Sequence, residues 1–166
     1  SAQESGAVQV VTAYFVDVTE ARALQAAFEA SRLVVAILVL DNYEEMMKAG
    51  GDAGRSSIQA HVDERLGAWV AGTGAMLRKY NRDRYFLICD AQCFDSLVEG
   101  KFSVLESIHQ VVSADGVTAS LSIGAGRDCA DYESACQWAE KSIEMALSRG
   151  GDQAVVHDKL DFQFYG

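Results

Sequence analysis

A short stretch of the sequence gathers charged side chains in a pattern that suits phosphate chemistry. Within residues 76–90, MLRKYNRDRYFLICD, the carboxylate of Asp83 stands between the guanidinium groups of Arg82 and Arg84, and Lys79 lies shortly before them. Guanidinium groups bind phosphate through paired hydrogen bonds. The pattern therefore predicts a site for a phosphate-bearing ligand. The alternative is that these residues are the solvated charges of an ordinary surface turn.

Two short strands joined by a polar turn are expected to position these charges. Leu77 and Tyr80 precede the turn, and the β-prone run Tyr-Phe-Leu-Ile follows it at residues 85–88. Asn81 and Asp83 are residue types that suit a tight turn. The stretch is therefore predicted to form a hairpin that carries the cations at its tip.

A second group of polar side chains, Asp41 and Asn42, follows the apolar run LVVAILVL at residues 33–40. An unbroken aliphatic run of this length is typical of a central strand buried on both faces. Open α/β sheets bind ligands at the carboxyl ends of such strands. Asp41 and Asn42 are therefore candidate ligand contacts. The alternative role for either side chain is to cap a helix that begins at Tyr43.

The composition restricts the class of partner. The chain has 166 residues, enough for one domain with a substantial core. Its 24 acidic and 14 basic residues give a formal net charge of −10, which repels nucleic acid and anionic membranes but leaves room for small anions at local basic clusters. The four cysteines show neither a CxxC pair nor zinc-finger spacing, which favours a reducing, cytoplasmic setting.

The order of the predicted elements indicates the fold class. From residue 33 the sequence reads as strand, helices, hairpin, helix, strand, helix, strand. The helices are expected at 55–70, at 91–114 with a break at Gly100, and at 131–148, and the later strands at 117–125, 153–157 and 162–165. This order predicts an α/β (α+β) fold in which helices flank a central mixed sheet, as in the split βαβ palm. A strand at 8–16 and a helix at 21–31 resemble the end of a preceding domain.

Five segments in this order resemble the GGDEF domain, the fold of diguanylate cyclases. They are LVLDNY, KYNRDRY, VTASLSIGAG, AEKSIEMAL and RGGDQAVV, spread over residues 33–166. The resemblance implies a nucleotide-cyclase palm with a ferredoxin-like βαββαβ core. Residues 17–20 are similar to the end of a PAS domain that feeds a signalling helix. This places a domain boundary between a PAS-derived segment at 1–32 and a GGDEF domain at 33–166.

The sequence departs from the GGDEF pattern at the positions that carry the chemistry. The signature Gly-Gly-Asp-Glu-Phe falls on residues 81–85, so Asp83 keeps a metal-binding acid while Arg84 replaces the catalytic Glu. The other metal-binding Asp falls on Val39, and Asp41 matches the second acid of that strand. Positions that contact guanine or phosphate in the family fall on Met47, Ser56 and Leu147. Cyclisation of GTP uses two metal ions held by carboxylates, so the resemblance implies no working diguanylate cyclase.

One subgroup matches these departures better: the degenerate GGDEF domain of membrane-anchored cyclic-di-AMP phosphodiesterases of the GdpP type. The segments LDNYEE, R-x-D-R-Y and SRGGDQ…FYG resemble theirs. Such proteins combine transmembrane helices, a PAS domain, a degenerate GGDEF domain and a DHH/DHHA1 hydrolase module. The resemblance implies a cytoplasmic domain of a membrane-anchored bacterial parent, with PAS upstream and DHH/DHHA1 downstream. We expect the parent to be a homodimer. The chain itself has no Asp-His-His motif.

Two hypotheses of different class follow. In the first, which we favour, the chain is a regulatory domain that binds ATP or another purine nucleotide and relays a PAS signal to the phosphodiesterase. In the second, it is a weak ATPase in which Asp83 and Asp41 hold Mg²⁺ or Mn²⁺. The residues expected to contact the nucleotide are Asn42, Lys79, Asn81, Arg82 and Arg84.

Overall fold

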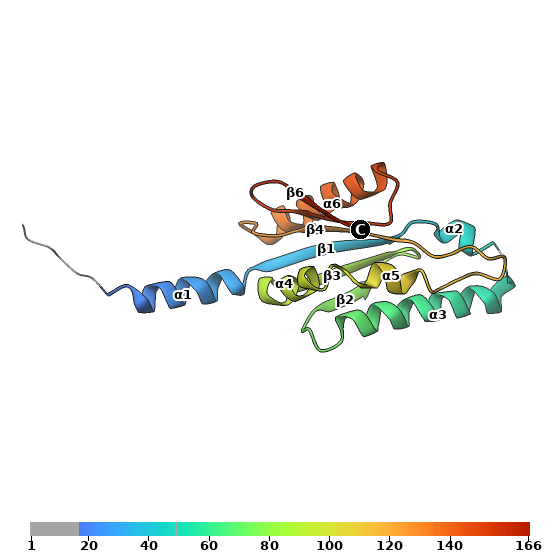
Figure 1. Ribbon diagram of the computed structural model, residues 1–166, viewed down its shortest axis with the longest axis horizontal. Helices are drawn as coiled ribbons and strands as arrows, with labels where there is room; N and C mark the ends of the chain where they lie inside the picture. The colour runs from blue at the N-terminus through green and yellow to red at the C-terminus, as the bar shows by residue number, and fades with distance from the viewer. Residues whose placement is uncertain (1–16, 49) are drawn as a thin grey trace, which may run out of the picture.

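The computed structural model describes residues 17–48 and 50–166, so the strand expected at 8–16 lies outside the described residues. The described strands form one mixed sheet in the order β2-β3-β1-β4-β5-β6 (Figure 1). They are β1 (Leu33–Leu40), β2 (Met76–Lys79), β3 (Arg84–Asp90), β4 (Leu121–Gly126), β5 (Ala154–His157) and β6 (Phe162–Tyr165). The helices are α1 (Thr19–Ala30), α2 (Tyr43–Met46), α3 (Gly51–Val70), α4 (Ala91–Glu99), α5 (Val104–Ile108) and α6 (Tyr132–Ser148).

The strand order contains the ferredoxin-like core that the sequence predicts. Strands β4, β1, β3 and β2 are neighbours in that order, and each pair is antiparallel. Helix α6 then leads to β5, which is parallel to β4, and β6 returns antiparallel to β5. The predicted α/β (α+β) fold with a central mixed sheet is therefore confirmed.

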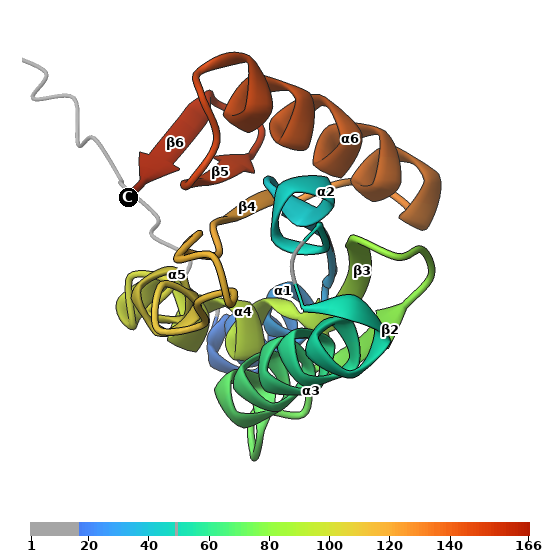
Figure 2. The same ribbon diagram turned by 90° about the vertical axis from the view of Figure 1, so that its right-hand side faces the viewer.

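Strand β1 is buried on both faces, as its aliphatic sequence predicts. Because successive side chains of a strand point to opposite faces, Val34, Ala36, Leu38 and Leu40 enter a core shared with α3, α4 and α5. Val35, Ile37 and Val39 enter a second core against α6. Figure 2 shows α6 on one side of the sheet and α3, α4 and α5 on the other. The carboxyl end of β1 thus lies between two helical layers.

Two glycines let α6 approach the sheet closely. A Cβ atom at Gly124 would lie 2.2 Å from the backbone N of Ile143, and one at Gly126 would lie 2.4 Å from the backbone O of Ala135. Any side chain at either position would therefore push the helix away from β4. This explains the Ile-Gly-Ala-Gly run at residues 123–126.

The segment predicted as one helix at 91–114 forms two shorter ones. The break at Gly100 is confirmed, but α5 already ends at Ile108. Lys101 and Phe102 between the helices have φ values of +48° and +49°. The Phe102 ring is almost fully buried, with its centroid 5.2 Å from that of Tyr165 and 5.9 Å from that of Phe94. Burial of a large aromatic side chain, worth about 1.5–3 kcal/mol, offsets the cost of this backbone conformation.

Helix α1 extends away from the body of the domain and leads into β1 (Figure 1). Its start is fixed by Asp17, whose Oδ1 accepts hydrogen bonds from the backbone N of Thr19 at 2.9 Å and from its Oγ1 at 2.6 Å. Leu24 and Phe28 on this helix are 72% and 67% exposed, so α1 buries little of its apolar stripe within the domain.

Over the described residues, no helix combines the length and the apolar character that a bilayer crossing requires.

Candidate functional site

The fold brings the charged hairpin against the carboxyl end of β1. Val39 lies opposite Arg84 in the antiparallel register, and the backbone N of Leu40 donates to the backbone O of Asp83 at 2.8 Å. The two segments are more than forty residues apart in the sequence. Their pairing places the turn 80–83 beside the loop that follows β1.

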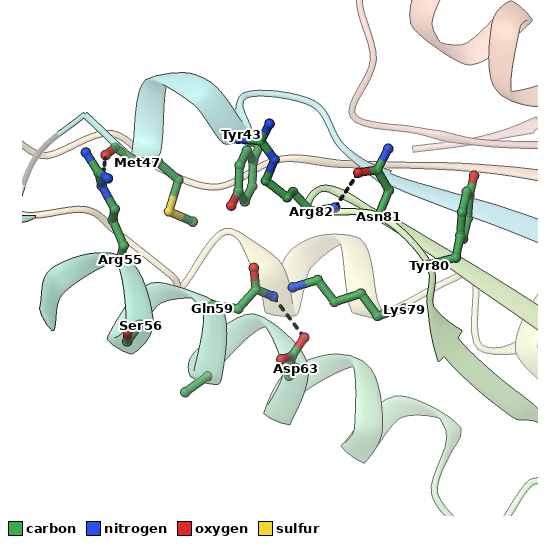
Figure 3. A pocket seen from close by; sticks show the side chains of 11 residues that line it. Tyr43, Met47, Arg55, Ser56, Gln59, Asp63, Lys79, Tyr80, Asn81 and Arg82 are labelled. Carbon is green, nitrogen blue, oxygen red and sulfur yellow. Dashed lines mark hydrogen bonds between the residues drawn. The ribbon is translucent and has the colours of Figure 1, made fainter. Parts of the chain in front are cut away.

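A pocket of about 680 Å³ opens between this hairpin and helix α3 (Figure 3). Helix α3 contributes Arg55, Ser56, Gln59, Ala60 and Asp63. Tyr43 and Met47 come from α2 and the residue that follows it, and the hairpin contributes Lys79, Tyr80, Asn81 and Arg82. The volume falls in the range of small-molecule sites. The pocket is open to solvent along one side, so a ligand can enter without any movement of the chain.

Cationic side chains surround the pocket. Lys79 and Arg82 extend from the hairpin, and neither forms an ion pair with any residue that the structure describes. Arg55 on the opposite wall donates from Nε to the backbone O of Met47 at 2.8 Å. That bond holds the guanidinium at the pocket rim. In a chain of net charge −10, this is a local concentration of positive charge suited to an anionic ligand.

Below the cations, three polar side chains form a closed hydrogen-bond network. The hydroxyl of Tyr85 donates to Oδ1 of Asp63 at 2.6 Å, and Nε2 of Gln59 donates to the same Oδ1 at 2.9 Å and to the Tyr85 hydroxyl at 2.7 Å. Tyr85 is only 3% exposed. Its burial, followed by its bond to Asp63, raises the pKa of the hydroxyl. Tyr85 is therefore a hydrogen-bond donor to Asp63 at any physiological pH.

Sequence reasoning missed Gln59 and Asp63 as parts of the site. They lie 26 and 22 residues from Tyr85, and only the packing of α3 beside β3 brings the three together. Their spacing of four residues on a helix places both side chains on one face. The sequence signal that could have identified them is this pair of polar residues on one face of a helix expected to pack beside the hairpin.

Of the predicted site residues on the hairpin, Lys79, Asn81 and Arg82 line the pocket, whereas Asp83 and Arg84 do not. The strand alternation places Arg84 on the same face as Phe86, which packs in the α6-side core, and opposite Val39. Asn81 also shapes the turn, because its Oδ1 accepts from the backbone N of Arg82 at 2.8 Å.

The predicted ligand contacts after β1 bind other parts of the chain. Asn42 donates from Nδ2 to the backbone O of Thr118 at 2.7 Å and accepts at Oδ1 from the backbone N of Ser120 at 3.1 Å. Although Asn42 precedes α2, its side chain makes no capping bond there. Its amide thus anchors the segment before β4, and it does not line the pocket.

Asp41 faces the loop between α6 and β5. Its Oδ2 accepts from the backbone N of Asp152 at 3.0 Å, and a Cβ atom at Gly151 would lie 2.8 Å from that oxygen. The other oxygen, Oδ1, is buried without a hydrogen-bond partner, as is the nearby Oγ of Ser122. Burial is the main cause that raises the pKa of Asp41. The side chain of Asp41 is thus bound to the loop between α6 and β5.

The acidic side chains that the structure describes bear on whether the domain could hold a divalent cation. Within residues 17–48 and 50–166, no three or more His, Cys, Asp or Glu side chains are grouped so that they could hold a metal ion. Val39 contributes an aliphatic side chain where the GGDEF resemblance places an acid. Mg²⁺ or Mn²⁺ would find Asp83 as its carboxylate on the hairpin and would have to take its remaining ligands from a bound nucleotide and water.

Solved structures with this architecture define the class of fold. The chain superimposes on the active GGEEF domain of a diguanylate cyclase from Vibrio cholerae with a TM-score of 0.65 at 9% identity, covering 82% of this chain and 88% of that one. The GGDEF domain of DgcB from Caulobacter crescentus, in complex with c-di-GMP, gives 0.65 at 12% identity, with 81% and 84% covered. The fold is therefore that of a GGDEF domain.

Sequence comparison narrows the class to one family. Residues 38–164 match the GGDEF domain of cyclic-di-AMP phosphodiesterase GdpP-like proteins, and the chain belongs to this family. It is 33% identical over 156 residues to cyclic-di-AMP phosphodiesterase GdpP from Bacillus subtilis. It is 32% identical over 154 residues to cyclic-di-AMP phosphodiesterase PdeA from Listeria monocytogenes. Each match covers 92% of this chain but 23% of the relative, so the chain spans about a quarter of their length.

Proposed function

We propose that the chain is a regulatory domain that binds a purine nucleotide in the pocket between α3 and the hairpin, and that it does not make cyclic-di-GMP. In this proposal it belongs to a membrane-anchored cyclic-di-AMP phosphodiesterase and lies in the cytoplasm. A PAS domain precedes it, and a DHH/DHHA1 module that follows hydrolyses the cyclic dinucleotide. The names of the relatives support a phosphodiesterase as the parent, and their greater length leaves room for further domains.

The observation that carries the nucleotide proposal is the set of cations around the pocket. Lys79 and Arg82 approach from the hairpin and Arg55 from α3, all in an otherwise acidic domain. Phosphate groups are the ligand chemistry that such a set recognises best. The rest of the pocket, with Tyr43, Met47 and Ala60, offers aromatic and apolar surface that suits a base.

The absence of cyclase activity is supported by the pairing of Val39 with Arg84. In the GGDEF resemblance these positions hold a metal-binding acid and the catalytic acid. Here one is an aliphatic residue that is 4% exposed in the α6-side core and the other is a cation. A charge clamp of two metal ions needs carboxylates at this point. We therefore infer a binding function; the alternative, a weak ATPase, would need Asp83 and Asp41 to hold the metal ion, and Asp41 already binds the backbone N of Asp152.

Helix α1 is proposed to carry the signal into the domain and to pair with its counterpart in a homodimeric parent. Its exposed Leu24 and Phe28 are one helical turn apart. A helix of twelve residues is marginal in water when it has nothing to pack against. Because α1 leads into β1, a change in its orientation reaches the strand that pairs with β3 of the hairpin.

Calorimetric titration of ATP into the chain tests the binding proposal. Replacing Lys79 or Arg82 by Ala should weaken binding, each by about 3- to 10-fold, because each removes a charge-assisted contact worth roughly 0.7–1.4 kcal/mol at an exposed site. Arg78→Ala is the matched control, because Arg78 neighbours Lys79 in sequence but does not line the pocket. Equal effects at Lys79 and Arg78 would show that ATP does not bind where we place it.

Regulation is tested in the longer parent protein. If the pocket controls hydrolysis of cyclic-di-AMP, ATP should change the rate of the parent enzyme, and Lys79→Ala should remove that change while Arg78→Ala keeps it. A hydrolytic rate that ATP leaves unaltered would reject the regulatory role even if the isolated domain binds ATP.

A further inference from the structure

The orientation of the Gln59 amide follows from its neighbours. The buried Tyr85 hydroxyl donates its hydrogen bond to Asp63 at 2.6 Å. Because its single hydrogen is used there, the hydroxyl oxygen can only accept in its contact with Gln59. Oδ1 of the Asp63 carboxylate also accepts from Gln59, at 2.9 Å. Both contacts therefore require the NH₂ group of Gln59. Its carbonyl oxygen must point the other way.

The free carbonyl oxygen of Gln59 faces the pocket. Figure 3 shows it directed away from Asp63, into the space between α3 and Tyr43. It accepts no hydrogen bond from the residues that the structure describes. Tyr43 on the other side of this space offers an aromatic ring on which a purine can stack. A hydrogen-bond acceptor held beside an aromatic ring can distinguish purine bases, because it binds a base that presents a donor at its edge and disfavours one that presents an acceptor.

We propose that Gln59 reads the base of the bound nucleotide by accepting a hydrogen bond from the exocyclic amino group of a 6-aminopurine. Tyr85 and Asp63 are positioning residues, because they fix which end of the amide faces the ligand. This inference rests on the proposed nucleotide site and adds its base preference. A purine with a carbonyl at position 6, as in hypoxanthine or guanine, places an acceptor against the Gln59 oxygen, which leaves both without a donor.

The two kinds of recognition are assigned to different residues, the phosphates to Lys79 and Arg82 of the hairpin and the base to Gln59 of α3. Lys79 and Arg82 contact phosphates whatever the base, whereas Gln59 contacts only the base. Binding of inorganic tripolyphosphate therefore reports on the cations alone. The ratio of the dissociation constants for ITP and ATP reports on recognition of the base, because the two nucleotides differ only in the purine ring, chiefly at position 6.

The experiment is a calorimetric titration of the chain with ATP, ITP and tripolyphosphate. We expect ATP to bind about tenfold more tightly than ITP. Gln59→Met, which keeps the length of the side chain but removes the acceptor, should bring the ratio close to one and leave tripolyphosphate binding unchanged.

The positioning role is tested by the neighbours. Tyr85→Phe alone leaves Asp63 to hold the amide, so the ATP preference should persist. The double change Tyr85→Phe with Asp63→Ala removes both acceptors, so the amide can turn and the ratio should fall towards one. Tripolyphosphate binding at a temperature well below the melting point verifies that the variant is folded.

The outcomes separate this inference from the proposed function. If the unaltered chain binds ATP and ITP equally, Gln59 does not read the base, while the nucleotide site stands. If tripolyphosphate and both nucleotides fail to bind, the nucleotide site itself is rejected, and the base preference with it. If Gln59→Met keeps the full ATP preference, another group recognises the base and the assignment to Gln59 is overturned.

Discussion

Replacing Gly151 by Ala should destabilise the domain by more than its backbone conformation alone explains. Gly151 has φ +78°, and a Cβ atom there would lie 2.8 Å from Oδ2 and 2.9 Å from Cγ of Asp41. The carboxylate cannot easily move aside, since the backbone N of Asp152 binds it at 3.0 Å and the buried Ser122 hydroxyl lies close by. The structure thus predicts two costs, a strained backbone and an overfilled contact.

The size of each cost follows from a matched control at Gly72. This glycine has φ +74°, and a Cβ atom there would meet nothing within 4 Å. Gly72→Ala should therefore cost about 1–2 kcal/mol for the left-handed conformation alone. Gly151→Ala should cost about 1–3 kcal/mol more, because the added carbon must displace a held carboxylate. For a domain of this size the difference corresponds to roughly 2–12 °C in melting temperature.

Chemical denaturation of the two variants measures the difference in the free energy of unfolding. A double variant with Asp41→Ala and Gly151→Ala removes the obstructing carboxylate, so the extra cost of Gly151→Ala should largely vanish in that background. The reasoning fails if Gly151→Ala is no less stable than Gly72→Ala. In that case Asp41 would be free to move, and its place beside the loop would not be fixed by packing.

Two further predictions concern titration and thiol access. Burial raises the pKa of Asp41 above 3.8, so the folded chain keeps this proton where the unfolded chain has lost it. The stability that the protonated Asp41 contributes is thus present below about pH 4 and is lost as the pH rises through the pKa of the folded state. Asp41→Asn cannot ionise, so it should become more stable relative to the unaltered chain as the pH rises. Denaturation curves at several pH values measure this difference. Burial also raises the pKa of Cys129 to about 11, so iodoacetamide should label it slowly at pH 8 and faster towards pH 10, as read by mass spectrometry. Cys89, which is buried, should react only on unfolding.

The fold could be predicted from the sequence where local pattern and tertiary environment agree. The aliphatic run 33–40, the turn residues at 81–83 and the helix at 131–148 each have one satisfactory structural interpretation, and the structure contains all three. The helical pattern failed at residues 101–103, between α4 and α5, and again after Ile108, where α5 ends. Between the two helices the buried ring of Phe102 requires a left-handed backbone, and no periodicity in the sequence shows that a side chain from the linker enters the core.

The site was harder to predict because its contacts come from separate elements. The hairpin cations stood out in the sequence, and three of the predicted residues, Lys79, Asn81 and Arg82, do line the pocket. The signal for Asp41 and Asn42 was their place after a buried strand. That signal does not show whether a side chain will bind a ligand or a neighbouring loop. Here Asn42 binds the segment before β4, and Asp41 binds the loop between α6 and β5. Their assignment as ligand contacts stays a prediction, as does that of Asp83.

The residue type at position 39, where the GGDEF resemblance places a metal-binding acid, affects the stability of the domain. An acid at this position would enter the core between the sheet and α6, where Val39 itself is 4% exposed. Burying a charged carboxylate there without a metal costs several kcal/mol, whereas burying Val is favourable by about 1.5–3 kcal/mol. An acid at position 39 would therefore carry a cost that only a bound cation offsets, which accords with the general conflict between a strained active site and a stable fold.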